Sequence, residues 1–522
     1  SAYSLLKSDG LIMSVNLNIS YEGKLDYVVE LLAKDGVISD DISLNIPFNV
    51  NQYIIDADGK TELTETTRSD FSVPKEANGI FIGNHKAGAV VQFLSNTNFE
   101  TEAEGKLDRN FTSYDSWCNF GRGYVELTPT DNGVSLTTST GRVILATGQR
   151  RIFKFSVYLT PFKDNVLGKA FAMRDIAAAN CEKIDKKLAA ACAMRANAIA
   201  LPVNAVIKKD SNDNFTLSNH SAELVKKAHA QGVSINIEYA PTENISTTFE
   251  EDALKQFGDE IVSSIDEKRN VCNMTSNYYL EQVNSLYKMC LVDGIDVKDD
   301  ILTRSTVERL AKLTNRKSGF AGTLSAHSGN VNKPIDVADA LINRIHMLPF
   351  IDRYVYTNSC KKVAMRDILL KLSCNLFGTG ATFNASGLDV MFPLLFGATG
   401  YIPAYKKKEA DKAMRFMSYL DNNNIQNHTM YGYWDERNPV SADMPDIYVT
   451  TYIDGNNANV VIYNDSKKSV EFDLGINPKK GFSSKGKKIF KPEIVSVQKK
   501  VNINFNKQLK LKGKRAMLIV VK

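Results

Sequence analysis

At 522 residues the chain is too long for one ordinary hydrophobic core, and we expect about three domains. Its hydrophobic content of 43% and charged content of 24% are typical of a soluble globular protein and exclude a disordered chain. The formal net charge is only +5, and no apolar run reaches the roughly 18 residues that a membrane-spanning helix needs.

The first part of the chain, residues 1–150, has β-strand patterns almost throughout. Apolar and polar residues alternate at 11–19, 27–32, 42–46 and 125–129. Turn dipeptides occur between such runs at Asp35-Gly36, Asp58-Gly59 and Asn132-Gly133. This pattern predicts an N-terminal β-sandwich.

The middle part, residues 151–440, alternates short strand patterns with helical ones, which is typical of βαβ units. Strands are expected to begin near Ile152, Asn197, Val233, Val292, Phe320, Phe350 and Cys374. Helical patterns lie between them at 182–195, 222–230, 249–264, 279–291 and 307–313. The number and size of these units predict an α/β fold, a (β/α)8 TIM barrel.

The last part, residues 441–522, returns to β patterns and predicts a small antiparallel β-domain. Two apolar runs flank the turn residues 454–457, residues 501–506 alternate strictly, and residues 517–521 form a buried-strand pattern. The protein is therefore expected to combine an α/β barrel with two flanking all-β domains.

The end of this domain is strongly basic. Residues 477–522 contain fourteen Lys or Arg and one acid, Glu493, so they carry +13 and the rest of the chain carries −8. Such a module predicts binding to an anionic surface or polymer, or self-association with another copy. The alternative is a set of lysines that protect strand edges from pairing. Few aromatic residues are interleaved with the basic ones, so nucleic-acid binding is not expected.

The most informative segment is residues 291–309, in which a short strand pattern leads through acidic residues into a helix. Asp299 and Asp300 would lie at the carboxyl end of that strand, and Ser305-x-x-Glu308 has the form of a capping box. In barrels this edge is where ligands bind. The cluster is therefore a candidate active site, although a solvated acidic loop would show the same pattern.

Several short motifs in order resemble a bacterial family of glycoside-hydrolase-like proteins whose activity is largely uncharacterised. They are Tyr158-Leu-Thr-Pro-Phe162, Phe257-Gly-Asp-Glu-Ile261, residues 292–299 with Arg304 and Arg309, Ala326-His-Ser-Gly-Asn330, Leu348-Pro-Phe-Ile-Asp-Arg353 and Gly432-Tyr-Trp434. The resemblance covers most of the chain. It implies a sandwich, a barrel and a C-terminal β-domain, with a glycan as the partner and carboxylates at the barrel opening as the catalytic groups.

The resemblance implies roles for three acids. Asp299 would be the nucleophile or stabiliser, and either Asp300 or Glu243 would be the proton donor. Glu243 follows the strand expected at Ser234 to Tyr239 and matches an acid of the family. Glycoside hydrolysis usually takes two such carboxyl groups, about 5–5.5 Å apart for retention and 6.5–9.5 Å for inversion.

Four further residues are candidates for substrate binding. His327 follows the strand expected from Phe320 to Ala326 and would share the barrel opening with Asp299. Asp296 lies on the preceding strand, where it could also simply pair with Lys298. Tyr433 and Trp434 could stack on a sugar ring, and packing in the core is their alternative role.

The chain also departs from the family pattern. The pattern has two consecutive acids where this chain has Lys298-Asp299, an acid where Ser325 stands, and a Gly-Glu where Thr357-Asn358 stand. Loss of a proton-transferring group typically costs about 10²–10⁴-fold in rate. The alternative to an active hydrolase is therefore an inactive barrel that serves as a glycan-binding or structural subunit of an extracellular assembly.

No cofactor and no metal are expected. The six histidines lack metal-ligand spacing, the seven cysteines form no Cys-x-x-Cys, and no phosphate-binding glycine loop occurs. The first residues, Ser-Ala-Tyr-Ser, lack the features of a signal peptide, so we expect a processed chain. A carbohydrate-directed function favours an extracellular, cell-surface or periplasmic location.

Overall fold

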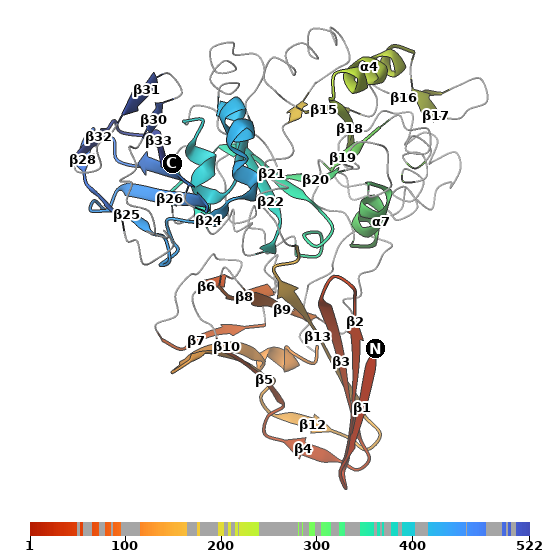
Figure 1. Ribbon diagram of the computed structural model, residues 1–522. Coiled ribbons are helices and arrows are strands. Elements are labelled where there is room, and N and C mark those ends of the chain that lie inside the picture. Colours follow the sequence, from red (N-terminus) through yellow and green to blue (C-terminus); the bar gives the residue numbers. More distant parts are fainter. Residues whose placement is uncertain are drawn as a thin grey trace.

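The computed structural model places three β-rich segments in chain order (Figure 1). It describes residues 1–49, 53–55, 65–71, 79–84, 87–94, 115–163, 175–177, 197–202, 207–209, 215–217, 219–239, 280, 284, 292–297, 304–314, 323–328, 345–359, 363–365, 368–369, 377–384, 389–401, 416–455, 457–476, 493–496, 499–502 and 508–521. Among these residues, no helix has the length and apolar character needed to cross a membrane.

The N-terminal segment is built from two main antiparallel sheets. The larger sheet has the order β1 (Ala2–Lys7), β2 (Leu11–Ile19), β3 (Lys24–Ala33), β13 (Arg150–Thr160), β9 (Gly88–Leu94), β8 (Gly79–Gly83) and β6 (Tyr53–Ile55). The smaller has β5 (Ser43–Phe48), β11 (Gly133–Ser139), β10 (Tyr124–Thr130) and β7 (Thr67–Asp70), and β4 (Val37–Ser39) pairs with β12 (Val143–Leu145). A short 3₁₀ helix, η1, spans Asn119–Gly121.

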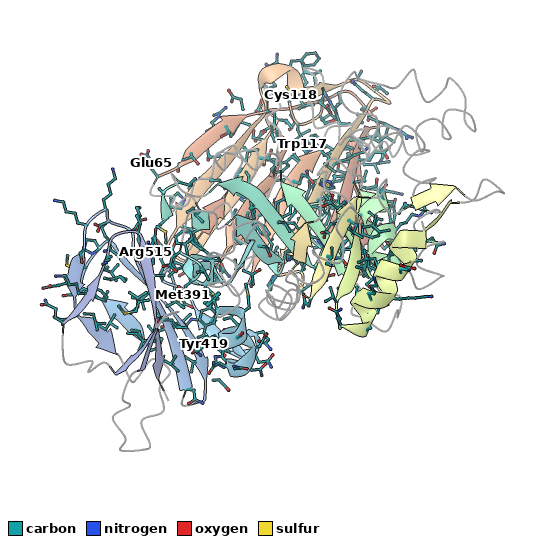
Figure 2. All side chains as sticks on the ribbon, turned by 90° about the horizontal axis from the view of Figure 1, so that it is seen from above. Glu65, Trp117, Cys118, Met391, Tyr419 and Arg515 are labelled. Carbon is teal, nitrogen blue, oxygen red and sulfur yellow. The ribbon has the colours of Figure 1, made fainter. Side chains whose placement is uncertain are left out.

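The two sheets bury one shared core between them, so this segment is a β-sandwich. Trp117 lies in that core (Figure 2) and packs edge-on against Phe153, with ring centroids 4.9 Å apart. Its indole Nε1–H donates to the Lys154 carbonyl over 2.8 Å, which satisfies the one polar group of the ring. The turn predicted at Asn132-Gly133 joins β10 to β11.

One predicted strand has a different place in the structure. The strand expected from Ile152 was assigned to the α/β segment, but it is β13, which pairs with β3 and β9 inside the sandwich. Local pattern does not distinguish a strand that enters a parallel sheet from one that completes the preceding sheet. The proposed domain boundaries at 150 and 440 stay a prediction.

The middle segment forms one parallel sheet with its strands in sequential order. The strands are β14 (Asp175–Ala177), β15 (Ala198–Pro202), β18 (Ser234–Tyr239), β19 (Gly294–Val297), β20 (Thr323–Ser328), β21 (Arg353–Ser359), β22 (Gly380–Asn384) and β23 (Thr399–Tyr401). Helices α4 (Asn219–Ala230) and α7 (Arg304–Thr314), a hairpin of β16 (Ile207–Lys209) and β17 (Phe215–Leu217), and the 3₁₀ helix η6 (Phe392–Phe396) accompany them. In the part of the chain that the structure describes, no pairing joins β14 to β23.

The amino ends of β18 and β19 are held by a buried carboxylate. Asp293 is 1% exposed, and its Oδ2 accepts the Ile235 backbone N–H over 2.8 Å. The same oxygen lies 2.8 Å from Nε2 of His229 near the end of α4. This side chain therefore joins a helix to two neighbouring strands, at the edge of the sheet opposite the carboxyl ends.

The C-terminal segment is a six-stranded antiparallel sheet with two small strand pairs. Its order is β24 (Thr429–Tyr431), β26 (Ile447–Asp454), β27 (Asn457–Asn464), β33 (Arg515–Val521), β30 (Glu493–Ser496) and β31 (Lys499–Asn502). The pairs are β25 (Val440–Ala442) with β29 (Leu474–Ile476), and β28 (Val470–Phe472) with β32 (Leu509–Leu511); η7 spans Ile425–Asn427. The predicted turn between β26 and β27 is confirmed, and its Gly455 has a φ of 57°.

The parallel sheet shares its core with both neighbours. Tyr158 and Phe81 of the sandwich lie in the same apolar cluster as the buried face of the parallel sheet, and so does Tyr463 of the C-terminal sheet. At the same end of the sandwich, Glu22 pairs with Arg304 of α7, whose guanidinium lies 4.8 Å from the Phe350 ring centroid. Burial lowers the pKa of Arg304 to about 10, so the guanidinium remains charged at neutral pH.

The C-terminal segment contains a buried histidine, His428. The His428 side chain is 5% exposed, and its Nδ1 accepts from Asn459 Nδ2 over 3.3 Å, which requires a neutral ring nitrogen. Burial lowers the pKa of His428 below its ordinary value, and the Asp454 carboxylate opposes this only in part.

We therefore expect acid to destabilise this segment. Because the folded pKa of His428 is depressed, the unfolded chain takes up the proton first, and stability present above about pH 6.5 is lost as the pH falls through the folded value. Urea unfolding followed from about pH 7.5 to about pH 5 should show the midpoint falling, and less steeply in His428→Gln. Equal slopes for the two proteins would contradict this explanation.

Candidate functional site: the polar face of the parallel sheet

The parallel sheet has one apolar and one polar face. In β18 and β19, Ile235, Ile237 and Ile295 point into the main apolar cluster and are at most 1% exposed. Because side chains alternate along a strand, the residues between them, among them Asn236 and Asp296, face the other side. A parallel strand covered on both faces is usually apolar throughout, so this polar face calls for an explanation.

One row of this face carries two acids side by side. Strand register aligns Pro202, Glu238, Asp296, Ser325, Arg353 and Gly380 across neighbouring strands. Glu238 and Asp296 are direct partners, so their backbones lie roughly 4.8 Å apart. Each comes one residue before the end of its strand. The two carboxyl groups therefore share a face close to the carboxyl edge of the sheet, the edge at which all its strands end.

Two charged residues of this face are fully removed from solvent, whereas Glu238 is only partly buried. Asp296 and Arg353 are both 0% exposed. Arg353 Nη1 donates to Thr382 Oγ1 over 3.3 Å, and the Thr382 and Thr399 hydroxyls are hydrogen-bonded at 2.8 Å. Taking a charge out of water costs several kcal/mol unless partners compensate it. A buried polar network of this kind is expensive as plain core packing and is usual beneath a polar binding site.

The three predicted catalytic acids follow this row in the chain, but the structure does not describe them. Asp299 and Asp300 come shortly after Val297, the last residue of β19, and Glu243 comes shortly after Tyr239, the last residue of β18. All three acids lie outside the described residues, so their assignment stays a prediction. The helix after them, α7, spans Arg304–Thr314. The capping pattern had predicted Ser305 as the residue before the helix, but Ser305 lies inside its first turn.

The predicted binding residues occupy two different places. Asp296 belongs to the polar row. His327 lies within β20 and not after it, in backbone register with Val355 and two residues beyond Ser325. Tyr433 and Trp434 lie in the C-terminal segment, where both rings pack against Phe396 with centroid distances of 5.9 Å and 6.5 Å. Core packing, the alternative for these two aromatic residues, is what the structure shows, and sugar stacking stays a prediction.

Several polar residues of this face were not singled out from the sequence. Asn236, Glu238, Thr382 and Thr399 had no assigned role, and Arg353 was noted only as part of a family motif. The signal was present in Ser234-Ile-Asn-Ile-Glu238, where strict alternation in a strand of a parallel sheet marks a polar inner face. Thr382 and Thr399 gave no such signal, because an isolated threonine is common in any strand.

Within the described residues, His, Cys, Asp and Glu form no group that could hold a metal ion. Cys118 is a free buried thiol in the sandwich, and the other six cysteines lie outside the described residues.

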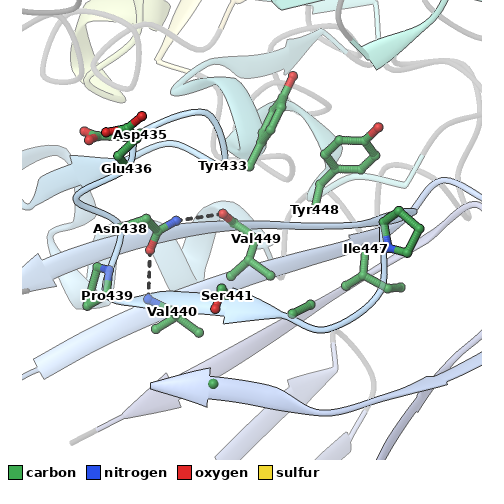
Figure 3. Close-up of a pocket in the computed structure, with 13 residues that line it drawn as sticks. Tyr433, Asp435, Glu436, Asn438, Pro439, Val440, Ser441, Ile447, Tyr448 and Val449 are labelled. Atoms are coloured by element: carbon green, nitrogen blue, oxygen red, sulfur yellow. Dashed lines mark hydrogen bonds between the residues drawn. The ribbon is translucent and has the colours of Figure 1, made fainter. Parts of the chain in front are cut away.

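A separate hollow lies in the C-terminal segment. Figure 3 shows the groove, which has a volume of about 710 Å³, with Tyr433 and Tyr448 on one side and Pro439, Val440 and Ser441 on the other. Its lining residues are Tyr433, Asp435, Glu436, Asn438, Pro439, Val440, Ser441, Ala442, Pro445, Ile447, Tyr448, Val449 and Gly475. The polar row of the parallel sheet contributes nothing to it.

Comparison with solved structures gives weak likenesses to glycoside hydrolases. A maltogenic α-amylase from Thermotoga neapolitana is 11% identical with a TM-score of 0.46, over 68% of this chain and 100% of that one. An α-amylase from Lactobacillus plantarum is 10% identical at 0.44, over 68% and 100%. A β-arabinopyranosidase is 11% identical at 0.38, over 100% and 91%. No curated protein sequence matches the chain.

Family models match both ends of the chain. Residues 2–161 match the third domain of glycoside hydrolase 123, and residues 413–522 match the C-terminal domain of the same family. Together these matches cover a little more than half of the sequence, and they include the sandwich and the C-terminal sheet. The chain thus belongs to a glycoside-hydrolase-like family, as its motifs had indicated.

Proposed function

We propose that this protein hydrolyses glycosidic bonds at the carboxyl edge of its parallel sheet, which closes into a (β/α)8 barrel. The carrying observation is the pair Glu238 and Asp296, two acids in direct register on the polar face, one residue from the ends of their strands. Family membership makes a glycan the natural ligand. Eight parallel strands in sequential order are the arrangement from which such barrels are built.

The proposed chemistry uses carboxylates above this row. Asp299 acts as nucleophile or stabiliser, and Asp300 or Glu243 donates the proton to the leaving oxygen. Asp296 and Arg353, which are fully buried in the polar row, would line the floor of such a site. His327 would bind a sugar hydroxyl next to these acids, because its strand neighbours β19 in the sheet.

A hydrolysis screen tests this proposal. The full chain is incubated with synthetic aryl glycosides of both anomeric forms and with natural oligosaccharides, and released sugar is measured. The proposal is supported if the wild type turns over any substrate and a variant lacking the predicted acids does not. Absence of turnover across the panel, with a correctly folded protein, would contradict it.

One observation favours a second function, an inactive barrel that binds glycans or serves as a structural subunit of an extracellular assembly. Ser325 stands where the family pattern has an acid, and the structure places it in the row between Asp296 and Arg353. A hydroxyl there cannot replace the proton transfer of a carboxyl group. Binding of a glycan without hydrolysis would support this function, and an extracellular or surface location is part of both proposals.

The basic end of the chain gives the assembly proposal its own test. If residues 477–522 bind an acidic partner or another copy, association should weaken as salt rises from about 50 mM to about 500 mM, because the screening length falls from about 14 Å to about 4 Å. Replacing Lys485, Lys487, Lys488 and Lys491 by Gln should abolish the salt-sensitive species in sedimentation.

Within the described part of the basic segment, two lysines already have acidic partners in their own domain. Lys510 pairs with Glu471 at 2.7 Å and Lys514 with Asp465 at 2.6 Å. Such pairs fit the alternative of protected strand edges. Identical, salt-independent sedimentation of the wild type and the Gln variant would support that alternative and remove the tail from the assembly proposal.

A further inference from the structure

The groove in the C-terminal segment is built on a rigid frame. The Asn438 side chain donates to the Tyr431, Gly432 and Val449 carbonyls and accepts from the Val440 N–H and the Thr451 hydroxyl. This single side chain therefore fixes the loop to β25 and β26, and two of its hydrogen bonds are drawn in Figure 3. Because this wall is already ordered, a ligand that binds there does not have to order the loop, and that entropic cost of binding is avoided.

The neighbouring loop residues are fixed as well. Asp435 is buried, and it accepts the Arg437 backbone N–H at 2.9 Å and the Arg437 guanidinium at 3.0 Å and 2.7 Å. The Tyr433 hydroxyl donates to the Met365 carbonyl at 3.1 Å, which ties the groove to the segment of the parallel sheet. Tyr433 packs edge-on against Tyr448 at 4.9 Å, so one wall of the groove is aromatic.

Two hydroxyl groups in this frame make no hydrogen bond to any residue that the structure describes. Within the described residues, neither the Tyr448 hydroxyl nor the Ser441 hydroxyl makes a hydrogen bond, and both residues line the groove. Pro445, Ile447 and Val440 also line the groove and are apolar. A sugar presents both kinds of surface, C–H faces for aromatic and apolar groups and hydroxyls for polar ones.

The charge around the groove restricts the ligand further. Glu436 is exposed at the rim. Burial raises the pKa of the Tyr448 hydroxyl, and the negative charges of Asp465 and Asp446 raise it further, so this hydroxyl stays protonated and available as a donor. The carboxylates of Glu436, Asp446 and Asp465 would repel a negatively charged ligand, so an anionic sugar is disfavoured.

We propose that this groove is a second glycan-binding site, separate from the parallel sheet, that takes a short neutral oligosaccharide. Its volume of about 710 Å³ lies within the roughly 300–1,000 Å³ of small-ligand sites. The ligand class rests on the proposed carbohydrate function, but the groove does not need catalysis. A site of this kind would hold a glycan chain on the protein while another part of it lies at the carboxyl edge.

Gly475 offers a way to fill the groove without straining the backbone. It pairs with Ser441 in the sheet, its φ is not left-handed, and a Cβ built on it would lie 3.4 Å from the Ser441 hydroxyl, an ordinary contact distance. Gly475→Leu should therefore occupy the ligand space. Gly36→Leu is the matched control, because Gly36 is exposed in the sandwich and its Cβ would meet only the Leu145 carbonyl at 4.0 Å.

The test is calorimetric titration of the full chain with cellotriose, maltotriose, mannotriose and triacetylchitotriose, and with trigalacturonate as the anionic probe. At least one neutral trisaccharide should bind the wild type. Gly475→Leu should weaken its binding affinity at least about tenfold, a loss of about 1.4 kcal/mol. Gly36→Leu should leave the affinity unchanged. Trigalacturonate should not bind. If Gly475→Leu does not fold, the double variant Ser441→Ala with Tyr448→Phe replaces it, and it should also weaken binding.

Two results would overturn the inference: no neutral trisaccharide binds the wild type, or binding is equal in the wild type and the folded groove variants. Hydrolysis is measured separately, so the two proposals fail independently. Groove binding without turnover removes only the catalytic proposal, whereas turnover with binding unaffected by the groove variants removes only this one.

Discussion

Asp299→Asn is expected to lower the turnover of any glycoside that the wild type cleaves by about 10²–10⁴-fold or more. The reason is chemical, because an amide can neither attack the anomeric carbon as a carboxylate does nor stabilise positive charge there. The residue comes shortly after Val297, where β19 ends, so packing of the sheet does not require its charge. The melting temperature should change little, and initial rates with thermal unfolding curves measure both effects.

Asp35→Asn is a suitable control for this experiment. Asp35 is an exposed acid in the turn between β3 and β4, and β4 lies at the end of the sandwich that points away from the parallel sheet (Figure 1). The Asp35→Asn substitution removes the same charge as Asp299→Asn and should leave turnover unchanged. Wild-type turnover in Asp299→Asn would end the assignment of Asp299, and attention would move to Glu238 and Asp296, the acids that the structure places in register.

Asp293→Ala is expected to destabilise the parallel-sheet segment by about 2–4 kcal/mol. The substitution removes a hydrogen bond of a buried carboxylate to the Ile235 N–H and another to His229, and it leaves that N–H buried without its acceptor. Charge-assisted hydrogen bonds of this kind are the strong ones. The expected result is a lower urea midpoint for this segment, followed by circular dichroism.

Two further variants give reference values for this loss of stability. His229→Ala keeps the Ile235 hydrogen bond and should cost less than Asp293→Ala. Glu308→Ala removes the half-buried partner of Lys312 on α7, and an i,i+4 helix pair of this kind is worth only about 0.3–0.5 kcal/mol. A midpoint for Asp293→Ala no lower than that for Glu308→Ala would show that this carboxylate does not hold the strands together.

Strand positions could be predicted because alternation and turn residues act locally. The hairpin at Asp454 to Asn457 follows from its turn residues alone, and the strand at Ser234 to Tyr239 follows from its period of two. Strand partners could not be predicted in the same way. Whether the strand from Ile152 joins the sandwich or the parallel sheet depends on contacts with β3 and β9, which no local pattern reveals.

The sequence predicted an edge of the sheet for the candidate site, but not the polar residues that the structure brings together near it. The acids after β19 pointed to the carboxyl edge, and the polar row containing Asp296 lies close to that edge. The role of these acids stays a prediction. Arg353 and Thr382 come from other strands, and their shared hydrogen bond exists only because the register aligns those strands. The groove could not be predicted from the sequence either, because strand pairing brings Gly475 of β29 beside Ser441 of β25, and local sequence patterns do not show which strands pair.

The central position of β13 in the sandwich has a consequence for synthesis of the protein. Val29 and Phe93 are made long before Phe153 and Phe155, yet β3 and β9 join only through β13. A nascent chain that has emerged no further than β12 therefore exposes two unpaired strand edges, which are surfaces prone to wrong pairing. The sandwich can close only when β13 itself has left the ribosome, so a shortened chain ending before Arg150 should aggregate and not fold alone.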